Sequence, residues 1–158
     1  MLTRASQPLH HAALTALEVP LRYAQRGRSM AWAAMAGATA LQPLRHYPEH
    51  DVVDRQNGVR FYYHTHPIEG GEGEHGHFHV FQERGPAFHH LAALSLDPQG
   101  RPVRWFCTNR WVTGETWPSP TDLRDSITRF KVSTRGKMAP VAAWLQALFA
   151  LYADDLMA

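Results

Sequence analysis

The sequence predicts an α+β fold in which an antiparallel meander sheet of about four or five strands is flanked by N- and C-terminal helices. Apolar residues recur with helical spacing near both ends of the chain, whereas from roughly residue 52 to residue 113 they alternate with a period of two. Short turn sequences separate the alternating segments, and short connections favour antiparallel pairing. We expect a single domain over residues 1–158, a length that suits one hydrophobic core.

The N-terminal part predicts two helices and a connecting loop. A helix is expected over residues 7–18, where leucine and alanine form an apolar stripe, and Pro20 is expected to end it. A second, alanine-rich helix is expected over residues 29–36, before a glycine. Residues 40–50 contain two prolines and are expected to form a loop that leads into the sheet.

The middle of the chain predicts strands that are separated by turn residues such as glycine, asparagine and proline. The expected strands are Val59–His66, His75–Arg84, Ala87–Leu96 and Pro102–Thr108.

The C-terminal part returns to helical spacing. Ser119 is a plausible cap and Pro120 suits the first helical position. A last helix is expected to begin near Pro140, and its apolar stripe consists of Val141, Trp144, Leu145, Leu148 and Phe149.

Composition excludes several classes of protein. The formal net charge is only +2 and no basic block is present, so nucleic-acid binding is not expected. Cys107 is the single cysteine, which rules out an internal disulfide. The sequence shows neither a signal-peptide pattern nor an apolar run of membrane-spanning length. We therefore expect a cytoplasmic protein that does not bind a membrane.

Five histidines lie between His64 and His79, and four of them form two His-x-His pairs. Side chains alternate across a strand, so His64 and His66 share one face of the first strand, and His77 and His79 share one face of the next. The expected register places His66 opposite His77 and His64 opposite His79, which brings the four imidazoles together as metal ligands. The same register places Tyr62 opposite Phe81.

The apolar positions support this pairing, because they share the opposite face of the same two strands. These positions are Val59, Phe61, Tyr63, Phe78 and Val80. The alternative is a histidine-lined pocket that holds no metal.

Three further residues are candidates for the metal or for its surroundings, namely Glu74, His75 and His90. Glu69 and Glu72 are expected in a solvated loop, and alternation allows only one of His89 and His90 to face the cluster.

His90 would align with Cys107 if Leu94 pairs with Val103 across the intervening turn. The alternative for Cys107 is a small buried residue.

A polar and aromatic stretch follows the last expected strand, where loops on a rigid sheet often provide substrate-binding groups. Asn109, Arg110, Trp111 and Trp117 are the candidate substrate-binding residues. The alternative is that the tryptophans cover the core and that Arg110 pairs with Glu115.

Two residues are candidates for acid–base catalysis. Tyr62 is expected on the metal face, where its phenol could donate a proton, and Glu115 could act as a base. The alternative for Tyr62 is packing against Phe81.

The stretches HTHP, GEHGHFHVF, HLAALSLD and TNRWVTGETW resemble a family of uncharacterised bacterial proteins that is known as a domain of unknown function. The resemblance covers most of the chain from the first helix onward. It implies a compact bacterial domain and no established activity.

The His-x-His pair of His64 and His66 also resembles the first metal-binding motif of the cupins. Glu69 comes too early for the cupin spacing, and the second cupin motif is absent. The resemblance is therefore local.

An imidazole-rich site favours iron, copper, nickel or zinc over magnesium and calcium. We expect one transition-metal ion per chain, with iron or copper favoured and zinc possible. The favoured function is a small mononuclear non-haem iron or copper oxidoreductase, similar to an oxygenase, that acts on a small-molecule or peptide substrate. The alternatives are a zinc-dependent hydrolase or lyase and a non-catalytic metal-binding or sensing module. A homodimer is also possible, because the sheet edge could pair with a second copy.

Overall fold

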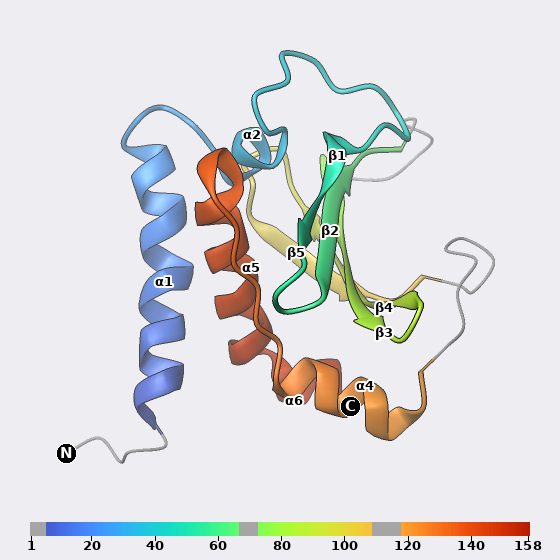
Figure 1. Ribbon diagram of the computed structural model, residues 1–158. Helices are drawn as coiled ribbons and strands as arrows, with labels where there is room; N and C mark the ends of the chain where they lie inside the picture. Colours follow the sequence, from blue (N-terminus) through green and yellow to red (C-terminus); the bar gives the residue numbers. More distant parts are fainter. Residues whose placement is uncertain (1–5, 67–72, 109–117) are drawn as a thin grey trace.

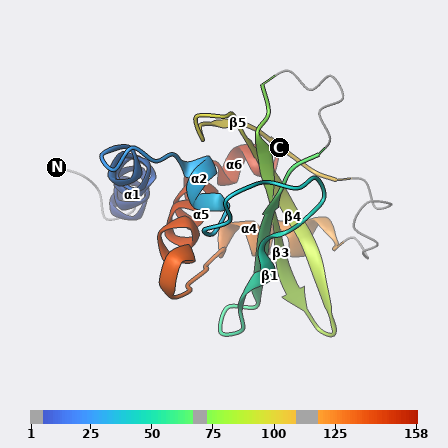
Figure 2. The ribbon, with the colours of Figure 1, turned by 90° about the horizontal axis from the view of Figure 1, so that it is seen from above.

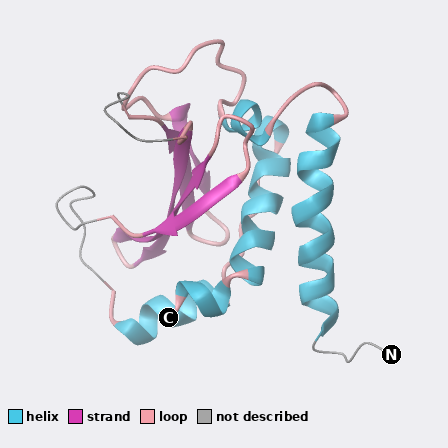
Figure 3. Cartoon of the chain, turned by 180° about the vertical axis from the view of Figure 1, so that it is seen from behind, coloured by secondary structure: helices cyan, strands magenta, loops and turns pink. Residues whose placement is uncertain are grey.

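A computed structural model describes residues 6–66, 73–108 and 118–158 of the chain. The fold is α+β, as predicted, with one antiparallel sheet of five strands in the meander order β1-β2-β3-β4-β5. In Figure 1 the layers run from α1 through α5 to the sheet, and Figure 3 shows the same layers from behind. The strands are β1 (Tyr47–Asp54), β2 (Val59–His64), β3 (Gly76–Arg84), β4 (Ala87–Leu96) and β5 (Pro102–Phe106).

The N-terminal helix is longer than predicted. It spans Ser6–Ala24 as α1, and Pro20 lies inside it instead of ending it. A proline inside a helix removes one hydrogen bond. Val19 is buried, and Tyr23 packs against the same core one turn further on, so the contact with α5 continues past Pro20.

Helix α2 is shorter than predicted and spans Met30–Ala34. Ser29 caps it, because its side chain accepts a hydrogen bond from the backbone N–H of Trp32 at 3.1 Å. Residues 47–50 were expected in a loop but belong to β1, which pairs with β2 through Tyr47 and Tyr63 before the ladder is interrupted. Pro48 is tolerated there because β1 is an edge strand.

The C-terminal elements are α4 (Pro120–Thr128), the short 3₁₀ helix η1 (Gly136–Met138), α5 (Ala139–Leu151) and α6 (Ala153–Leu156). Ser119 caps α4 and Pro120 occupies its first turn, as predicted. Helix α5 lies between α1 and the sheet (Figure 2), which is why it is apolar on most of its surface. All five residues of its predicted stripe are buried, among them Trp144, whose ring contacts Phe78 of β3.

The core lies between the sheet and α5, and the predicted apolar face of β2 and β3 lines it. Phe61, Tyr63, Phe78 and Val80 are fully buried there. The histidines of the same strands therefore project from the opposite face. None of the described helices is long and apolar enough to cross a membrane.

Two predicted registers were wrong. His64 lies opposite His77, and Tyr62 lies opposite His79, so the hairpin is shifted by two residues from the predicted pairing. A shift of two preserves the alternation of side chains, so the histidines keep the predicted face.

The pairing of β4 with β5 is also shifted by two residues, because Leu94 lies opposite Trp105 and not Val103. Strand β5 ends at Phe106, and Cys107 is exposed instead of buried.

Candidate metal centre

Three buried histidines meet on the face of the sheet that is turned away from α5. His64 is the last residue of β2, and His77 and His79 lie on β3. Their exposed fractions are only 8%, 4% and 2%. Because His64 and His77 are directly opposed across the two strands, their side chains start close together and extend in the same direction.

The imidazole nitrogens converge on His64. Its Nε2 lies 2.8 Å from Nε2 of His77 and 3.1 Å from Nε2 of His79. His66 follows the end of β2, is exposed, and stacks on His77 with ring centroids 5.2 Å apart. One ligand atom each from His64, His66 and His77 lie within 4.8 Å of one another, a spacing that could hold a metal ion. We call His64, His66, His77 and His79 the histidine cluster.

Glu74 orients one of these rings. Its Oε1 accepts a hydrogen bond from Nδ1 of His77 at 2.5 Å, and its Oε2 lies 3.6 Å from Nη2 of Arg104. A carboxylate can only accept, so Nδ1 of His77 carries the hydrogen and its Nε2 presents a lone pair toward His64. Metal-binding histidines are commonly held in this way by a carboxylate.

A second chain of contacts extends from His79. Its Nδ1 lies 3.0 Å from Nε2 of His90, and Nδ1 of His90 lies 3.4 Å from Oγ1 of Thr108. If Nδ1 of His79 is the donor, its Nε2 also presents a lone pair toward His64. The predicted supporting role of His90 is therefore compatible with its position, although its neighbour is Thr108 and not Cys107.

The buried histidines His64, His77 and His79 are uncharged at neutral pH, because the pKa of each is lowered. Burial, followed by repulsion from His77, lowers the pKa of His64 to about 3 and that of His79 to about 2. The same two causes lower the pKa of His90 to about 4. Burial also lowers the pKa of His77, although Glu74 opposes this effect. Neutral imidazoles are the form that binds a metal, so no proton has to be displaced from these rings.

Aromatic rings enclose the cluster. Phe106 contacts both His77 and His79, with ring centroids 5.1 and 6.4 Å away. Tyr62 is stacked between Phe81 and His46, and the His46 ring lies parallel to it at 3.6 Å. These contacts favour the packing alternative for Tyr62 that the sequence left open.

His46 is a neighbour of the site that sequence reasoning missed. Its ring meets that of His64 edge-on at 6.0 Å, and its Nδ1 lies within hydrogen-bond distance, 2.8 Å, of Oδ1 of Asp51. It lies 18 positions before His64 in a segment expected to be a loop, and no spacing in the sequence relates the two.

The other predicted residues divide into two groups. His75 lies away from the cluster, because its Nδ1 lies 2.8 Å from the hydroxyl of the core residue Tyr63. His75 was predicted to share the face of His77 and His79 by strand alternation. This prediction was wrong, because β3 begins only at Gly76 and the alternation does not extend to His75. The remaining candidates lie outside the described residues, namely Glu69, Glu72, Asn109, Arg110, Trp111, Glu115 and Trp117.

Comparison with known proteins identifies a family but no individual related protein. No curated protein and no solved structure matches the chain at a significant level. A family model with the description "Domain of unknown function (DUF6969)" matches residues 10–158, which include every residue of the histidine cluster. The chain therefore belongs to the DUF6969 family, in agreement with the resemblance found in its sequence.

Proposed function

We propose that this protein binds one transition-metal ion through the histidine cluster and uses it in an oxidoreductase reaction of the non-haem iron or copper type. The observation that carries the proposal is the convergence of the three Nε2 atoms of His64, His77 and His79. A hydrogen on Nε2 of His64 points in one direction and can form only one well-aligned hydrogen bond. A cation among the nitrogens would satisfy all of their lone pairs together.

The nitrogen spacing supports the choice of metal. Two nitrogens that bind one ion at a right angle, with bonds of about 2.1 Å, lie about 3.0 Å apart, whereas a tetrahedral zinc site separates them by about 3.4 Å. The distances of 2.8 and 3.1 Å from His64 are hydrogen-bond distances between the rings, and they are closer to the right-angled spacing than to the tetrahedral one. Octahedral and tetragonal sites of this kind are typical of iron and copper, and so we favour these metals over zinc.

The surroundings support an accessible site. His66 is the exposed member of the cluster, so that side of the site is open to solvent. When bound, an iron or copper ion would supply a position for a small ligand and the capacity to change oxidation state. Glu74 would hold the His77 ring in place, and His90 would do the same for His79. Phe106 and the Tyr62–His46 stack would exclude water from the inner side.

Metal content is the first test. The protein is purified without a histidine tag or chelator, and the metal that it carries as purified is measured by elemental mass spectrometry. We expect about one iron or copper per chain, and its loss in a His64→Ala/His79→Ala variant. The matched control is His10→Ala/His11→Ala, which removes two exposed histidines of α1 and should retain the metal. A parent protein without stoichiometric metal would overturn the proposal.

Two further measurements refine the result. Stoichiometric zinc in place of iron or copper would redirect the proposal to a hydrolase or lyase. Comparison of the single variants His66→Ala and His79→Ala would show which of the two completes the ligand set with His64 and His77. A metal-loaded protein that consumes oxygen with none of the substrates tested would count against the oxidoreductase and in favour of a binding or sensing module. A bound metal that changes its oxidation state with no oxidant would count against it in the same way.

A further inference from the structure

The other described elements of the chain cover only part of the apolar surface of helix α1. Ala12 and Val19 are buried toward α5, seven residues apart on one side of the helix. Leu14, Leu17 and Leu21 lie on another side and are 43%, 72% and 56% exposed. Figures 1 and 2 show why, since α1 is the outermost layer and no described element lies on its outer side.

The three exposed leucines have the spacing of a helix–helix seam. They follow one another at intervals of three and four residues, which is the alternation of a and d positions in a heptad. We call Leu14, Leu17 and Leu21 the leucine ridge. A row of this kind packs best against another helix.

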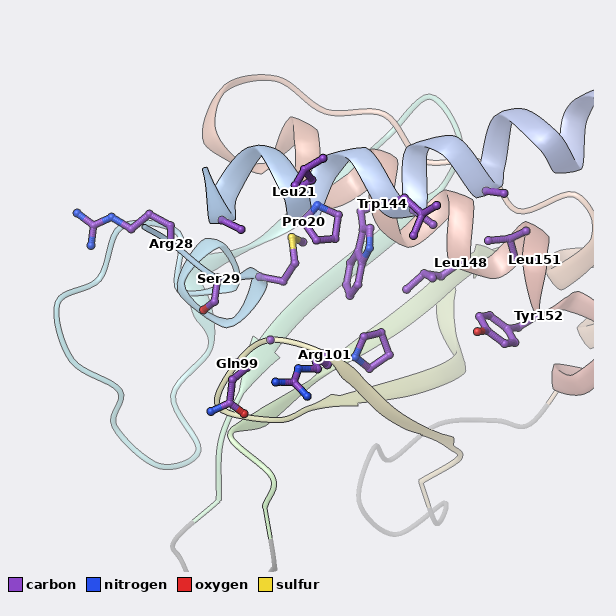
Figure 4. A pocket seen from close by; sticks show the side chains of 17 residues that line it. Pro20, Leu21, Arg28, Ser29, Gln99, Arg101, Trp144, Leu148, Leu151 and Tyr152 are labelled. Carbon is purple, nitrogen blue, oxygen red and sulfur yellow. The ribbon is translucent and has the colours of Figure 1, made fainter. Parts of the chain in front are cut away.

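A groove lies directly beside the leucine ridge. Its volume is about 550 Å³, and it runs between α1, the second half of α5 and the turn that joins β4 to β5. In Figure 4 α1 forms one wall, the turn with Gln99 and Arg101 forms the other, and Trp144 and Leu148 of α5 lie between them. The α1 wall is built mostly from small residues, namely Ala13, Ala16, Pro20 and Ala24, and Leu17 and Leu21 of the leucine ridge form its outer edge.

We propose that α1 mediates a two-fold symmetric dimer in which the leucine ridge of each copy packs into the groove of the other. A ridge and a groove side by side on one face are self-complementary, because a two-fold axis between them brings each ridge over the partner's groove. The inference is independent of the metal, since the histidine cluster lies on the opposite side of the sheet from α5 and α1.

Area and charge favour a second copy as the occupant. The leucine ridge and Leu9 leave on the order of 400 Å² of apolar surface in solvent, about half of what each partner contributes to a standard interface of ~800 Å². The other residues of the groove lining, among them Trp144, Leu148 and Tyr152, add to this area. The polar side of α1 carries the ion pair of Glu18 and Arg22 and not the excess of basic residues that a membrane-surface helix needs.

The test is the mass of the full chain in solution, measured by light scattering and sedimentation over a range of concentrations. We expect a dimer, and a rise of at least ~100-fold in its dissociation constant for Leu17→Glu/Leu21→Glu, because charges at the centre of an interface are poorly tolerated. Leu44→Glu is the matched control, since Leu44 is 60% exposed in the loop before β1 and should leave the dimer intact.

Each other outcome would overturn the proposal. A monomeric parent at all concentrations would exclude the dimer, and binding of that monomer to anionic vesicles would assign the leucine ridge to a membrane surface. A dimer that persists in the double variant would place the interface elsewhere, for example on a sheet edge. Leu17→Ala/Leu21→Ala retains good helix formers, so it gives the same comparison if the glutamate variant fails to fold.

Discussion

The buried histidines predict that the metal-free protein loses stability in mild acid. Unfolded histidines have a pKa near 6.5, whereas in the folded protein the pKa of His64 is about 3, that of His79 about 2 and that of His90 about 4. Below about pH 6.5 the unfolded chain therefore binds more protons than the folded one. The stability that the neutral histidines provide is fully present above pH 6.5. It decreases as the pH falls toward the pKa values of the folded protein.

The magnitude follows from the size of these shifts. At about pH 5 each of the three groups favours the unfolded state by about 2 kcal/mol relative to neutral pH. The sum of about 6 kcal/mol is an upper limit, because the first proton that enters the cluster meets no charged neighbour. We expect a loss of about 3–6 kcal/mol, which is a large part of the ~5–15 kcal/mol that stabilises a typical domain.

Urea denaturation of the chelator-treated protein between about pH 7.5 and pH 5 measures this effect. His79→Gln/His90→Gln removes two of the titrating groups and should reduce the slope of the unfolding free energy against pH by up to about 3 kcal/mol per pH unit. His10→Gln/His11→Gln removes two exposed histidines of α1 and should leave the slope unchanged. A free energy of unfolding that stays constant over this range, or an equal effect of both variants, would refute the argument that burial keeps the cluster neutral.

Three further predictions concern single residues. Glu74→Ala removes the carboxylate that holds His77, so metal affinity measured by competition with a chelator should fall about 10–100-fold. The affinity of Glu74→Gln should fall less, because its amide oxygen can still accept a hydrogen bond. Unchanged affinity in both variants would contradict the role of Glu74. Gly76→Ala would place a Cβ 2.5 Å from the His64 carbonyl oxygen, so the free energy of unfolding in urea should decrease by about 1–3 kcal/mol, and wild-type stability would show that the strands separate without cost. Ser119→Ala removes the hydrogen bond that the side chain accepts from the Asp122 N–H at 3.1 Å, and Tm should fall by about 2–4 °C with Ser119→Asn close to wild type.

Alternation along β2 and β3 was sufficient to predict which face each side chain occupies. The burial of Phe61 and Phe78 in the core and the projection of His64 and His79 from the other face both agree with it. The pairing was nevertheless wrong by two residues, because a shift of two leaves every side chain on the same face and so leaves the hydrophobic pattern unchanged. The register depends instead on the connection between the strands and on contacts such as the close approach of Gly76 to His64.

Local propensity failed where tertiary contacts outweighed it. Pro20 predicted the end of a helix, but the packing of α1 on α5 continues through Tyr23. The prolines before the sheet predicted a loop, but Pro48 lies on an edge strand, where the missing N–H is not needed by a second neighbour. In both cases the favourable packing lies in residues distant in sequence, which no local pattern contains.

The sequence by itself determined the α+β class, the meander of strands β2 to β5 between N- and C-terminal helices, the histidine face and the apolar residues of α5, because periodicity and turn residues act over short distances. Only the tertiary structure decided which nitrogens converge on His64, that Glu74 holds His77, and that His46 joins the site from outside the hairpin. It also decided which half of the apolar surface of α1 faces α5 and which half, the leucine ridge, remains exposed. These features depend on how separate elements pack against one another, and that packing is set by the whole core and not by any single segment.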